Sequence, residues 1–334
     1  MKVLVTGGAG YIGSHTMVEL LNAGYDVVCI DNFSNSKPET LENVKKITNR
    51  NFSFYEGDVC CKDVLNKIFD EQKIDVVIHF AGYKAVGESV KLPIKYYRNN
   101  LDSTLSLLEV MNSHNCKKIV FSSSATVYGK PEILPLKENS KLAPMNPYGT
   151  TKLMIEKILK DLYCSDNDWG IAILRYFNPV GAHESGLIGE DPNGIPNNLM
   201  PYIVKVATKE YPSLKVFGND YDTKDGTGVR DYIHVVDLAK GHVKAIEKIN
   251  RDNGIDCYNL GTGCGYSVLD LVETFKRVNN VEVPYEIVER RPGDIDMYYA
   301  DPVYAEEKLN WKAAKSIDDM CKDAYNFAIK QKRD

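Results

Sequence analysis

The chain has 334 residues, of which 43% are hydrophobic and 26% charged, and its net charge is −5. This length predicts about two domains, and the ordinary apolar content excludes a disordered or collagen-like chain. Without a block of basic residues or an apolar run of about 18 residues, neither nucleic-acid binding nor a membrane span is expected. The eight cysteines lack metal-ligand spacing, which predicts reduced thiols, a cytoplasmic protein and no metal site.

Short apolar runs alternate with helical patterns through the first part of the chain. The apolar runs cover residues 3–5, 27–30, 52–55, 76–80, 119–121 and 171–174, and the helical patterns cover residues 12–23, 38–48, 61–72, 93–115 and 148–165. Several runs are continuous rather than alternating, which is typical of strands buried on both faces of a parallel sheet. The predicted fold class is therefore α/β, with a Rossmann-like, doubly wound parallel sheet.

The pattern changes after Asn178. Residues 178–200 are rich in Gly, Pro and Asn and predict a long loop, which in a compact domain is usually functional. Helices are then expected near residues 200–210, 267–279, 302–309 and 316–331, and strands at 214–217, 229–235 and 257–260. We expect a first domain at residues 1–177 and a second lobe at 178–334. The two would be interwoven, because the segment at about 229–262 is expected to rejoin the main sheet.

A Gly-rich turn follows the first expected strand and precedes the first helix. Its Gly7, Gly10 and Gly13 have the spacing G-x-x-G-x-x-G, and Gly allows the backbone to approach a pyrophosphate at a helix N-terminus. The turn alone could be a plain strand–helix junction. Asp31, 24 positions after Gly7, ends the second strand, where an acid accepts the ribose hydroxyls of NAD and repels the 2′-phosphate of NADP. Together these residues predict a NAD-binding first domain.

Two more strands end in residues suited to a dinucleotide. Asp58 follows the third strand, and Phe80-Ala81-Gly82 ends the fourth. Ligands of open α/β sheets bind at the carboxyl ends of the strands, and small residues there let a cofactor lie against the backbone. Asp58 could instead be an ordinary turn residue.

A third group of residues predicts proton transfer. Tyr148 and Lys152 are four positions apart on an expected helix that Asn146 caps, so their side chains share one face. Tyrosine has a pKa of about 10 and becomes a useful base where a cation favours its phenolate. Ser124, in a serine run at the end of the fifth strand, could relay the proton. Taken separately, Tyr148 and Lys152 would also fit two exposed residues of a helix, and the serine run would also fit a polar loop.

In combination, the glycines, Asp31, the serine run and the Tyr148–Lys152 pair follow the order of motifs in the short-chain dehydrogenase/reductase family. The chain resembles the extended branch of that family and, within it, the UDP-glucose 4-epimerases. The matching segments are residues 78–82 (IHFAG), 84–89 (KAVGES), 175–182 (RYFNPVGA) and 228–235 (GVRDYIHV). The resemblance covers roughly residues 1–330. Tyr83 stands where the family pattern has an aliphatic residue, and no catalytic position differs from that pattern.

The resemblance implies a role for each of these positions. Tyr148 would be the catalytic base, Lys152 would lower its pKa and hold the nicotinamide ribose, and Ser124 would orient the sugar hydroxyl. The residues implied to contact NAD are Gly7, Gly10, Tyr11, Ile12, Gly13, Asp31, Asn32, Phe33, Ser34, Asn35, Ser36, Asp58, Val59, Phe80, Ala81, Gly82, Tyr83, Lys84, Asn99, Ser124, Tyr148, Lys152 and Phe177. The residues implied to contact the substrate are Ser124, Tyr148, Asn178, Asn198, Leu199, Phe217, Arg230, Arg291, Asp294 and Tyr298.

The activity implied by the resemblance is the interconversion of UDP-galactose and UDP-glucose through a transient 4-keto sugar, with NAD kept bound. A bulky Tyr298 would close the hexose pocket against N-acetylated sugars. The resemblance also implies a homodimer, formed through the helices expected at residues 93–115 and 148–165.

Two alternatives remain open at this stage. A nucleotide-sugar 4,6-dehydratase shares the fold, NAD and the Tyr-Lys pair, but it would place an Asp-Glu pair where Ala125-Thr126 stand. A non-catalytic, NAD-sensing regulator would keep the fold and be expected to lack Tyr148 or Lys152. The activity assay with UDP-galactose separates these classes.

Overall fold

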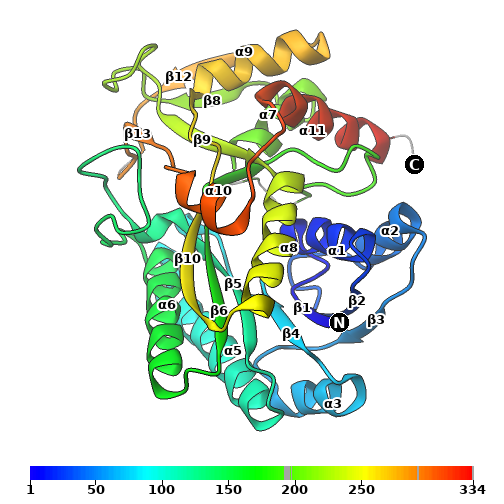
Figure 1. The fold of residues 1–334 in the computed structure, drawn as a ribbon. Coiled ribbons are helices and arrows are strands. Elements are labelled where there is room, and N and C mark those ends of the chain that lie inside the picture. Colours follow the sequence, from blue (N-terminus) through cyan, green and yellow to red (C-terminus); the bar gives the residue numbers. More distant parts are fainter. Residues whose placement is uncertain (192–195, 197, 292, 333–334) are drawn as a thin grey trace.

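The computed structural model describes residues 1–191, 196, 198–291 and 293–332, and its largest layer is a parallel sheet of seven strands (Figure 1). The strand order is β10-β6-β5-β4-β1-β2-β3. These strands are β1 (Lys2–Thr6), β2 (Asp26–Asp31), β3 (Ser53–Glu56), β4 (Val76–His79), β5 (Lys118–Ser124), β6 (Gly170–Tyr176) and β10 (Gly254–Leu260). Every residue of β4 and β6 is buried, which explains why their apolar runs are continuous. The predicted fold class is confirmed.

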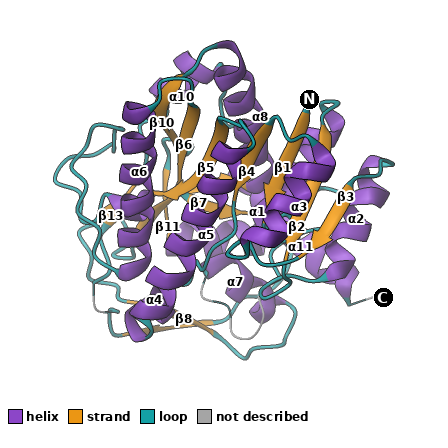
Figure 2. Ribbon diagram, turned by 90° about the horizontal axis from the view of Figure 1, so that it is seen from below, coloured by secondary structure: helices purple, strands orange, loops and turns teal. Residues whose placement is uncertain are grey.

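Helices cover both faces of this sheet (Figure 2). One face carries α1 (Tyr11–Asn22), α2 (Pro38–Thr48), α8 (Val235–Arg251) and α10 (Val303–Leu309), and the other carries α3 (Lys62–Gln72), α5 (Pro93–Ser113) and α6 (Pro147–Ser165). Each helix buries an apolar stripe; in α3 the stripe consists of Leu65, Ile68 and Phe69. Among the helices described, none is both long and apolar enough to cross a lipid bilayer.

The remaining strands form a smaller lobe, at the top of Figure 1. In one sheet the order is β11-β9-β13, with β7 also paired to β9, and β8 pairs separately with β12. These strands are β7 (Asn178–Val180), β8 (Leu214–Phe217), β9 (Val229–His234), β11 (Gly265–Ser267), β12 (Tyr285–Val288) and β13 (Met297–Tyr298). Helices α7 (Leu199–Ala207), α9 (Val268–Asn279) and α11 (Ile317–Gln331) pack around a separate core that includes Val216, Phe275 and Met320.

The chain passes between the two lobes more than once. Strand β10 follows β9 in sequence, yet it lies at the edge of the main sheet, parallel to β6. Helix α8 connects them and packs with α1 in one core. This helix is not among the predicted elements, although buried residues recur at Leu238, Ala239, Val243 and Ile246. Strand β7 also lies where only a loop is predicted, because its three residues pair with a distant strand.

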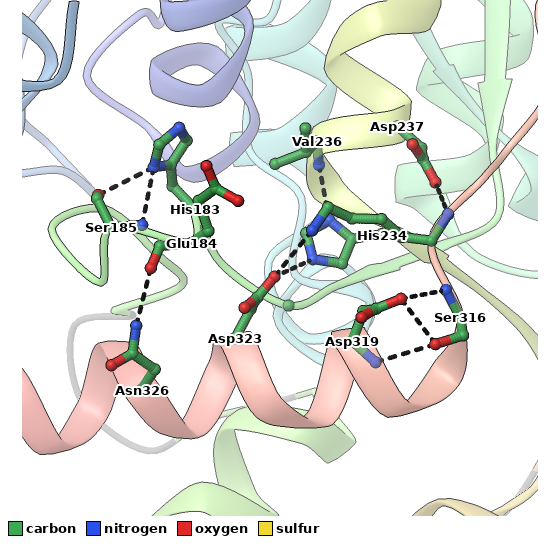
Figure 3. A network of polar contacts seen from close by, with 12 residues as sticks. His183, Glu184, Ser185, His234, Val236, Asp237, Ser316, Asp319, Asp323 and Asn326 are labelled. Carbon is green, nitrogen blue, oxygen red and sulfur yellow. Dashed lines mark hydrogen bonds and ion pairs between the residues drawn. The ribbon is translucent and has the colours of Figure 1, made fainter.

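Helix α11 ties the smaller lobe together (Figure 3). His234, at the end of β9, accepts the Val236 backbone N–H at Nδ1 over 3.1 Å, so its Nε2 carries the proton and donates to Asp323 over 3.1 Å. Asn326 Nδ2 donates to the Glu184 carbonyl oxygen over 3.0 Å. Helix α11 therefore holds both β9 and the loop that follows β7.

Candidate active site

The Gly-rich turn between β1 and α1 leaves room for a phosphate group. Gly7 has a φ of +69°, and a Cβ there would lie 3.0 Å from the backbone nitrogen of Ala81. A Cβ at Gly13 would lie 2.3 Å from the Gly7 carbonyl oxygen, so only glycine lets the turn and the helix pack this closely. In the described part of the chain no side chain caps α1 at Gly10, which leaves its first N–H groups available to an anion.

Asp31 ends β2 beside this turn, and its buried carboxylate is fixed on both oxygens. Oδ2 accepts from the Ala9 N–H over 2.9 Å. Oδ1 accepts from the Phe33 N–H over 2.9 Å and from Ser36 Oγ over 2.8 Å. Each carboxylate oxygen accepts about two hydrogen bonds, so Oδ2, which accepts one, retains capacity for a ribose hydroxyl.

The predicted residues at the end of β3 meet those at the end of β2. Asn32 Nδ2 donates to Asp58 Oδ2 over 3.2 Å. Ser34 and Asn35 are exposed in the loop between β2 and α2, while Val59 is buried. The two strand ends therefore form one polar edge with a buried apolar residue beneath it.

Asn100 is a buried asparagine of α5 that organises the end of β4. Its Oδ1 accepts from the Tyr83 N–H over 2.8 Å, and its Nδ2 donates to the Tyr83 carbonyl over 3.1 Å and to Thr151 Oγ1 over 3.1 Å. The predicted Asn99 donates to the same Oδ1 over 3.1 Å. Asn100 was not among the predicted residues, although a polar side chain on the buried face of a helix marks it. It ties the loop after Phe80 to α6.

Helix α6 presents the Tyr-Lys pair. Asn146 caps the helix and Pro147 occupies its first position, which confirms the predicted start. Tyr148 and Lys152 lie on one face, with Lys152 Nζ 5.9 Å from the centre of the Tyr148 ring. The side chain of Ser124, the last residue of β5, lies near enough to the Tyr148 hydroxyl to lower its pKa. The structure therefore brings together the three residues predicted for proton transfer.

Burial dominates the electrostatics of this pair. It raises the pKa of Tyr148 to about 12, and the side chain of Ser124 acts in the opposite direction. Burial also lowers the pKa of Lys152 to about 7, although the carboxylate of Glu156 raises it. Lys152 Nζ donates to the Ser122 carbonyl over 2.6 Å. The sequence predicts that Lys152 lowers the pKa of Tyr148; in the protein alone, the lost solvation of the phenolate outweighs any such effect.

The residues predicted to hold a nucleoside diphosphate come together in the smaller lobe. Arg230 on β9 donates to the Ile295 carbonyl over 2.7 Å, and its Nη2 lies 3.5 Å from Asp294 Oδ1. Asp294 Oδ2 also accepts from Arg291 Nε over 3.1 Å. The Arg291 guanidinium lies 4.7 Å from the centre of the Phe217 ring. Planar guanidinium groups suit phosphate oxygens, and an aromatic face suits a base.

Two other predicted substrate residues begin elements of the smaller lobe. Asn178 begins β7, directly after Phe177, and lies opposite Tyr232 of β9. Leu199 begins α7 and packs on the core of this lobe. Asn178 therefore stands on the strand next to the one that bears Arg230.

One carboxylate joins the cofactor-side residues to the substrate-side residues. Glu190 Oε1 accepts from Asn198 Nδ2 over 2.7 Å and lies 3.3 Å from Lys84 Nζ. The Tyr11 hydroxyl, at the start of α1, donates to the Gly181 carbonyl over 2.7 Å. The loop after β7 thus contacts the Gly-rich turn. Glu190 is a further residue that no sequence pattern marked.

Tyr298 on β13 packs beside the end of β5. It is 9% exposed, and its ring centre lies 5.6 Å from that of Phe177. It belongs to one cluster with Ala125 and Val127, which follow Ser124. Among the described residues, its buried hydroxyl finds no hydrogen-bond partner. The ring therefore fills volume next to the serine end of β5.

The position after Ser124 offers no acid. Ala125 is buried, and Thr126 Oγ1 donates to Ser124 Oγ over 3.0 Å. Neither side chain can transfer a proton as a carboxylate does. The acidic pair expected of a 4,6-dehydratase at this position is therefore replaced by residues that shape the turn.

Known proteins match nearly the whole chain. A family model described as GDP-mannose 4,6 dehydratase matches residues 4–324. The UDP-glucose 4-epimerase of Bacillus subtilis is 59% identical over 98% of this chain and 96% of its own. The UDP-glucose 4-epimerase of Pasteurella multocida is 58% identical over 99% of this chain and 98% of its own.

Solved structures agree with this match. The UDP-glucose 4-epimerase of Bifidobacterium longum in complex with NAD+ and UDP has a TM-score of 0.96 at 56% identity, over 99% of both chains. The enzyme of Stenotrophomonas maltophila, with NAD and formylated UDP-arabinopyranose, has a TM-score of 0.98 at 46% identity, over 100% of this chain and 99% of that one. The chain belongs to the UDP-glucose 4-epimerase family, within the extended short-chain dehydrogenases/reductases.

Proposed function

We propose that the chain interconverts UDP-galactose and UDP-glucose, using bound NAD. The observation that supports this most directly is that three groups of residues are joined in one site. Asn100 links the loop after β4 to helix α6, which bears Tyr148 and Lys152. Glu190 links Lys84, on the cofactor side, to an asparagine at the start of α7. An enzyme of this kind needs a cofactor, a proton-transfer group and a UDP site in contact.

The residues present fit NAD as the cofactor. The turn at Gly7 and Gly13 and the uncapped start of α1 suit a pyrophosphate, because a Cβ in that turn would collide with backbone atoms. Asp31 would accept the ribose hydroxyls, and its charge disfavours the 2′-phosphate of NADP. NAD, when bound, supplies the acceptor and then the donor of the hydride at C4 of the sugar.

The chain's own residues would move one proton at the sugar 4-hydroxyl. Ser124 would orient that hydroxyl, and Tyr148 would take its proton and later return it to the same oxygen. The ammonium group of Lys152 would favour the phenolate that accepts the proton in the first transfer. Between the two transfers the 4-keto sugar turns over, so that its other face is reduced. Because oxidation and reduction cancel, no second redox substrate is consumed.

The reaction requires a firm hold on UDP and a loose hold on the hexose. Arg230 and Arg291 would bind the diphosphate, while Asn178, Asn198, Leu199, Phe217 and Asp294 would bind the uridine side. Binding energy from this remote nucleotide would retain the keto sugar while it rotates. We assign NAD to residues 1–177 and the UDP-sugar to residues 178–334. Of the segment at about 229–262, β10 completes the main sheet, whereas β9 lies in the sheet of the smaller lobe.

Two other functions explain the site less well. A 4,6-dehydratase must remove water, and the turn at Ala125 and Thr126 has no acid for that step. A non-catalytic NAD-sensing regulator has no need of a proton-transfer pair, yet Tyr148 and Lys152 lie together on one face of α6. The relatives at 58–59% identity are also named as epimerases rather than dehydratases.

The proposal is tested with the purified protein and UDP-galactose, without added NAD. We expect UDP-glucose to form while heat denaturation releases stoichiometric NAD, since the cofactor is regenerated in each cycle. A UDP-4-keto-6-deoxy product would show a dehydratase instead. NAD binding without any turnover of UDP-galactose would favour the regulator.

Tyr298 leads to a prediction about substrate range. The wild-type protein should prefer UDP-glucose and UDP-galactose, because the ring occupies the space that a 2-N-acetyl group needs. Tyr298→Ser should raise kcat/KM for UDP-GalNAc by about 10- to 100-fold, a range typical of steric discrimination in a pocket. The neighbouring Tyr299→Ser serves as the matched control and should not widen the range. Comparable wild-type kcat/KM for acetylated and simple substrates would contradict the prediction.

We also propose a homodimer formed through α5 and α6, in the cytoplasm. Leu105 and Met154 are each 42% exposed on these helices, and Ile94 is 75% exposed at the start of α5. Exposed apolar residues that gather on one surface favour a protein partner. Leu108 and Ile155 of the same helices are buried within the subunit. The eight cysteines are free thiols, which supports a reducing compartment.

A further inference from the structure

Helix α6 continues past the Tyr-Lys pair to a third polar side chain. Glu156 follows Lys152 by four positions, as Lys152 follows Tyr148, so the three residues lie on one helical face in successive turns. Glu156 is fully buried, at 0% exposure. Its carboxylate has no part in the proton transfer proposed above, so its position calls for an explanation.

Three hydrogen bonds from two side chains hold this carboxylate. Arg175 of β6 binds it in a fork, from Nε to Oε1 over 2.9 Å and from Nη2 to Oε2 over 2.6 Å. Ser123 Oγ donates to Oε1 over 2.6 Å. Arg175 and Ser123 are direct neighbours in the paired strands β6 and β5. The carboxylate therefore joins α6 to both strands at one level of the sheet.

The end of β5 meets α6 at three successive turns. Its three consecutive serines each lie beside one of the α6 residues. Ser122 and Ser123 hydrogen-bond to Lys152 and Glu156, and Ser124 lies near enough to the Tyr148 hydroxyl to lower its pKa. An α-helix rises about 1.5 Å per residue, so a slip of one position would break all three contacts. The third contact along α6, between Ser123 and Glu156, is reinforced by the bidentate ion pair of Glu156 with Arg175.

A contribution to folding stability does not explain why this ion pair is present. Burying two charges costs desolvation, and apolar residues of similar volume in their place are often neutral or stabilising. Apolar neighbours are present on both elements, since Ile155 and Leu159 of α6 and Ile173 of β6 pack in one core. What an aliphatic side chain could not provide is a fixed negative charge one turn from Lys152.

We propose that Glu156 is a positioning residue for the catalytic pair: held by Arg175 and Ser123, it fixes α6 on β5 and keeps Lys152 positively charged. The inference rests on the proposed function, because it explains the role assigned there to Lys152. A charged Lys152 favours the phenolate form that Tyr148 needs to act as the base.

Three other titratable groups near the pair are uncharged near neutral pH, so they neither stabilise nor destabilise the Lys152 ammonium. Burial lowers the pKa of His79 on β4 to about 3, which leaves it neutral. Burial raises the pKa of Tyr96 on α5 and of Tyr176 on β6, which also stay neutral. Against the burial that lowers the pKa of Lys152, the carboxylate of Glu156 acts in the opposite direction.

Glu156→Gln tests the proposal because it keeps the size of the side chain and removes its charge. We expect the alkaline limb of the kcat profile for UDP-galactose, where Lys152 loses its proton, to move down by about one pH unit. Turnover well above that limb then falls about tenfold, since one unit is a tenfold change in protonation. Glu156→Gln combined with Arg175→Met also removes the unpaired cation, so it should fold even where the single variant does not. Its alkaline limb should move in the same direction but by less than in the single variant, because the removed cation had opposed the carboxylate.

A buried carboxylate elsewhere provides the matched control. Asp237 in α8 accepts the backbone N–H groups of Ala314 and Lys315 over 2.8 and 2.7 Å. Asp237→Asn should lower the thermal unfolding midpoint and leave the pH profile unchanged. A wild-type pH profile in the folded double variant would overturn the proposal and make the ion pair purely structural. No turnover of UDP-galactose by the wild-type protein would instead overturn the proposed function, so the two failures are distinct.

Discussion

Tyr148→Phe should lower kcat for UDP-galactose by about 10²- to 10⁴-fold, the range that a general acid–base group contributes. Phenylalanine fills the same space on α6, so only the hydroxyl that transfers the proton is lost. The fold and the bound NAD should remain, because the tyrosine oxygen holds neither the Gly-rich turn nor Asp31. The measurements are kcat, the thermal unfolding midpoint and the NAD released on denaturation.

Tyr163→Phe is the matched control, because Tyr163 lies on the same helix and packs on the core between the sheet and helices α3, α5 and α6. Its loss of a hydroxyl should leave kcat within about twofold, as expected for a residue outside the reaction. A Tyr148→Phe variant that keeps near wild-type turnover would remove Tyr148 from the role of base.

Lys152→Ala should move the acid limb of the kcat profile upward. Burial raises the pKa of Tyr148 to about 12, so the phenolate depends on neighbouring cations. In the wild type the Lys152 ammonium provides one such charge at and below its own pKa of about 7. Without it the phenolate forms only at higher pH, and each unit of upward shift lowers the phenolate population at a given acidic pH about tenfold. The full pH dependence of kcat is the measurement.

Lys157→Ala is the control for this variant, because Lys157 is an exposed lysine of the same helix. Its removal should leave both limbs in place, since an exposed charge is largely screened. An unchanged pH profile in Lys152→Ala would show that this lysine only holds the cofactor and does not act on Tyr148.

The parts of the fold that could be predicted are those specified by neighbouring residues. The run at residues 76–80 predicts a strand buried on both faces because its first three positions are all apolar rather than alternating. Asn146 and Pro147 predict the start of α6 because an N-cap and the first helical residue act locally. The spacing of Tyr148 and Lys152 predicts a shared face for the same reason.

The residues that were not predicted depend on partners far away in sequence. Glu190 gains its place from Lys84, 106 positions before it, and Asn100 from Thr151, 51 positions after it. Strand β7 exists through its pairing with β9. No spacing along the chain encodes such contacts, so the sequence could mark the chemistry of the site without the links between its parts.

The edge position of β10 has a consequence for the synthesis of the protein. A ribosome delivers the chain from its N-terminus, so β6 emerges long before Gly254, where β10 begins. Until then β6 presents an unpaired, apolar edge, of the kind that other chains can pair with. At about 5–20 residues per second, this edge stays open for roughly 4–16 s. The nascent chain is therefore most exposed to aggregation in that interval, when a chaperone that shields strand edges would have its greatest effect.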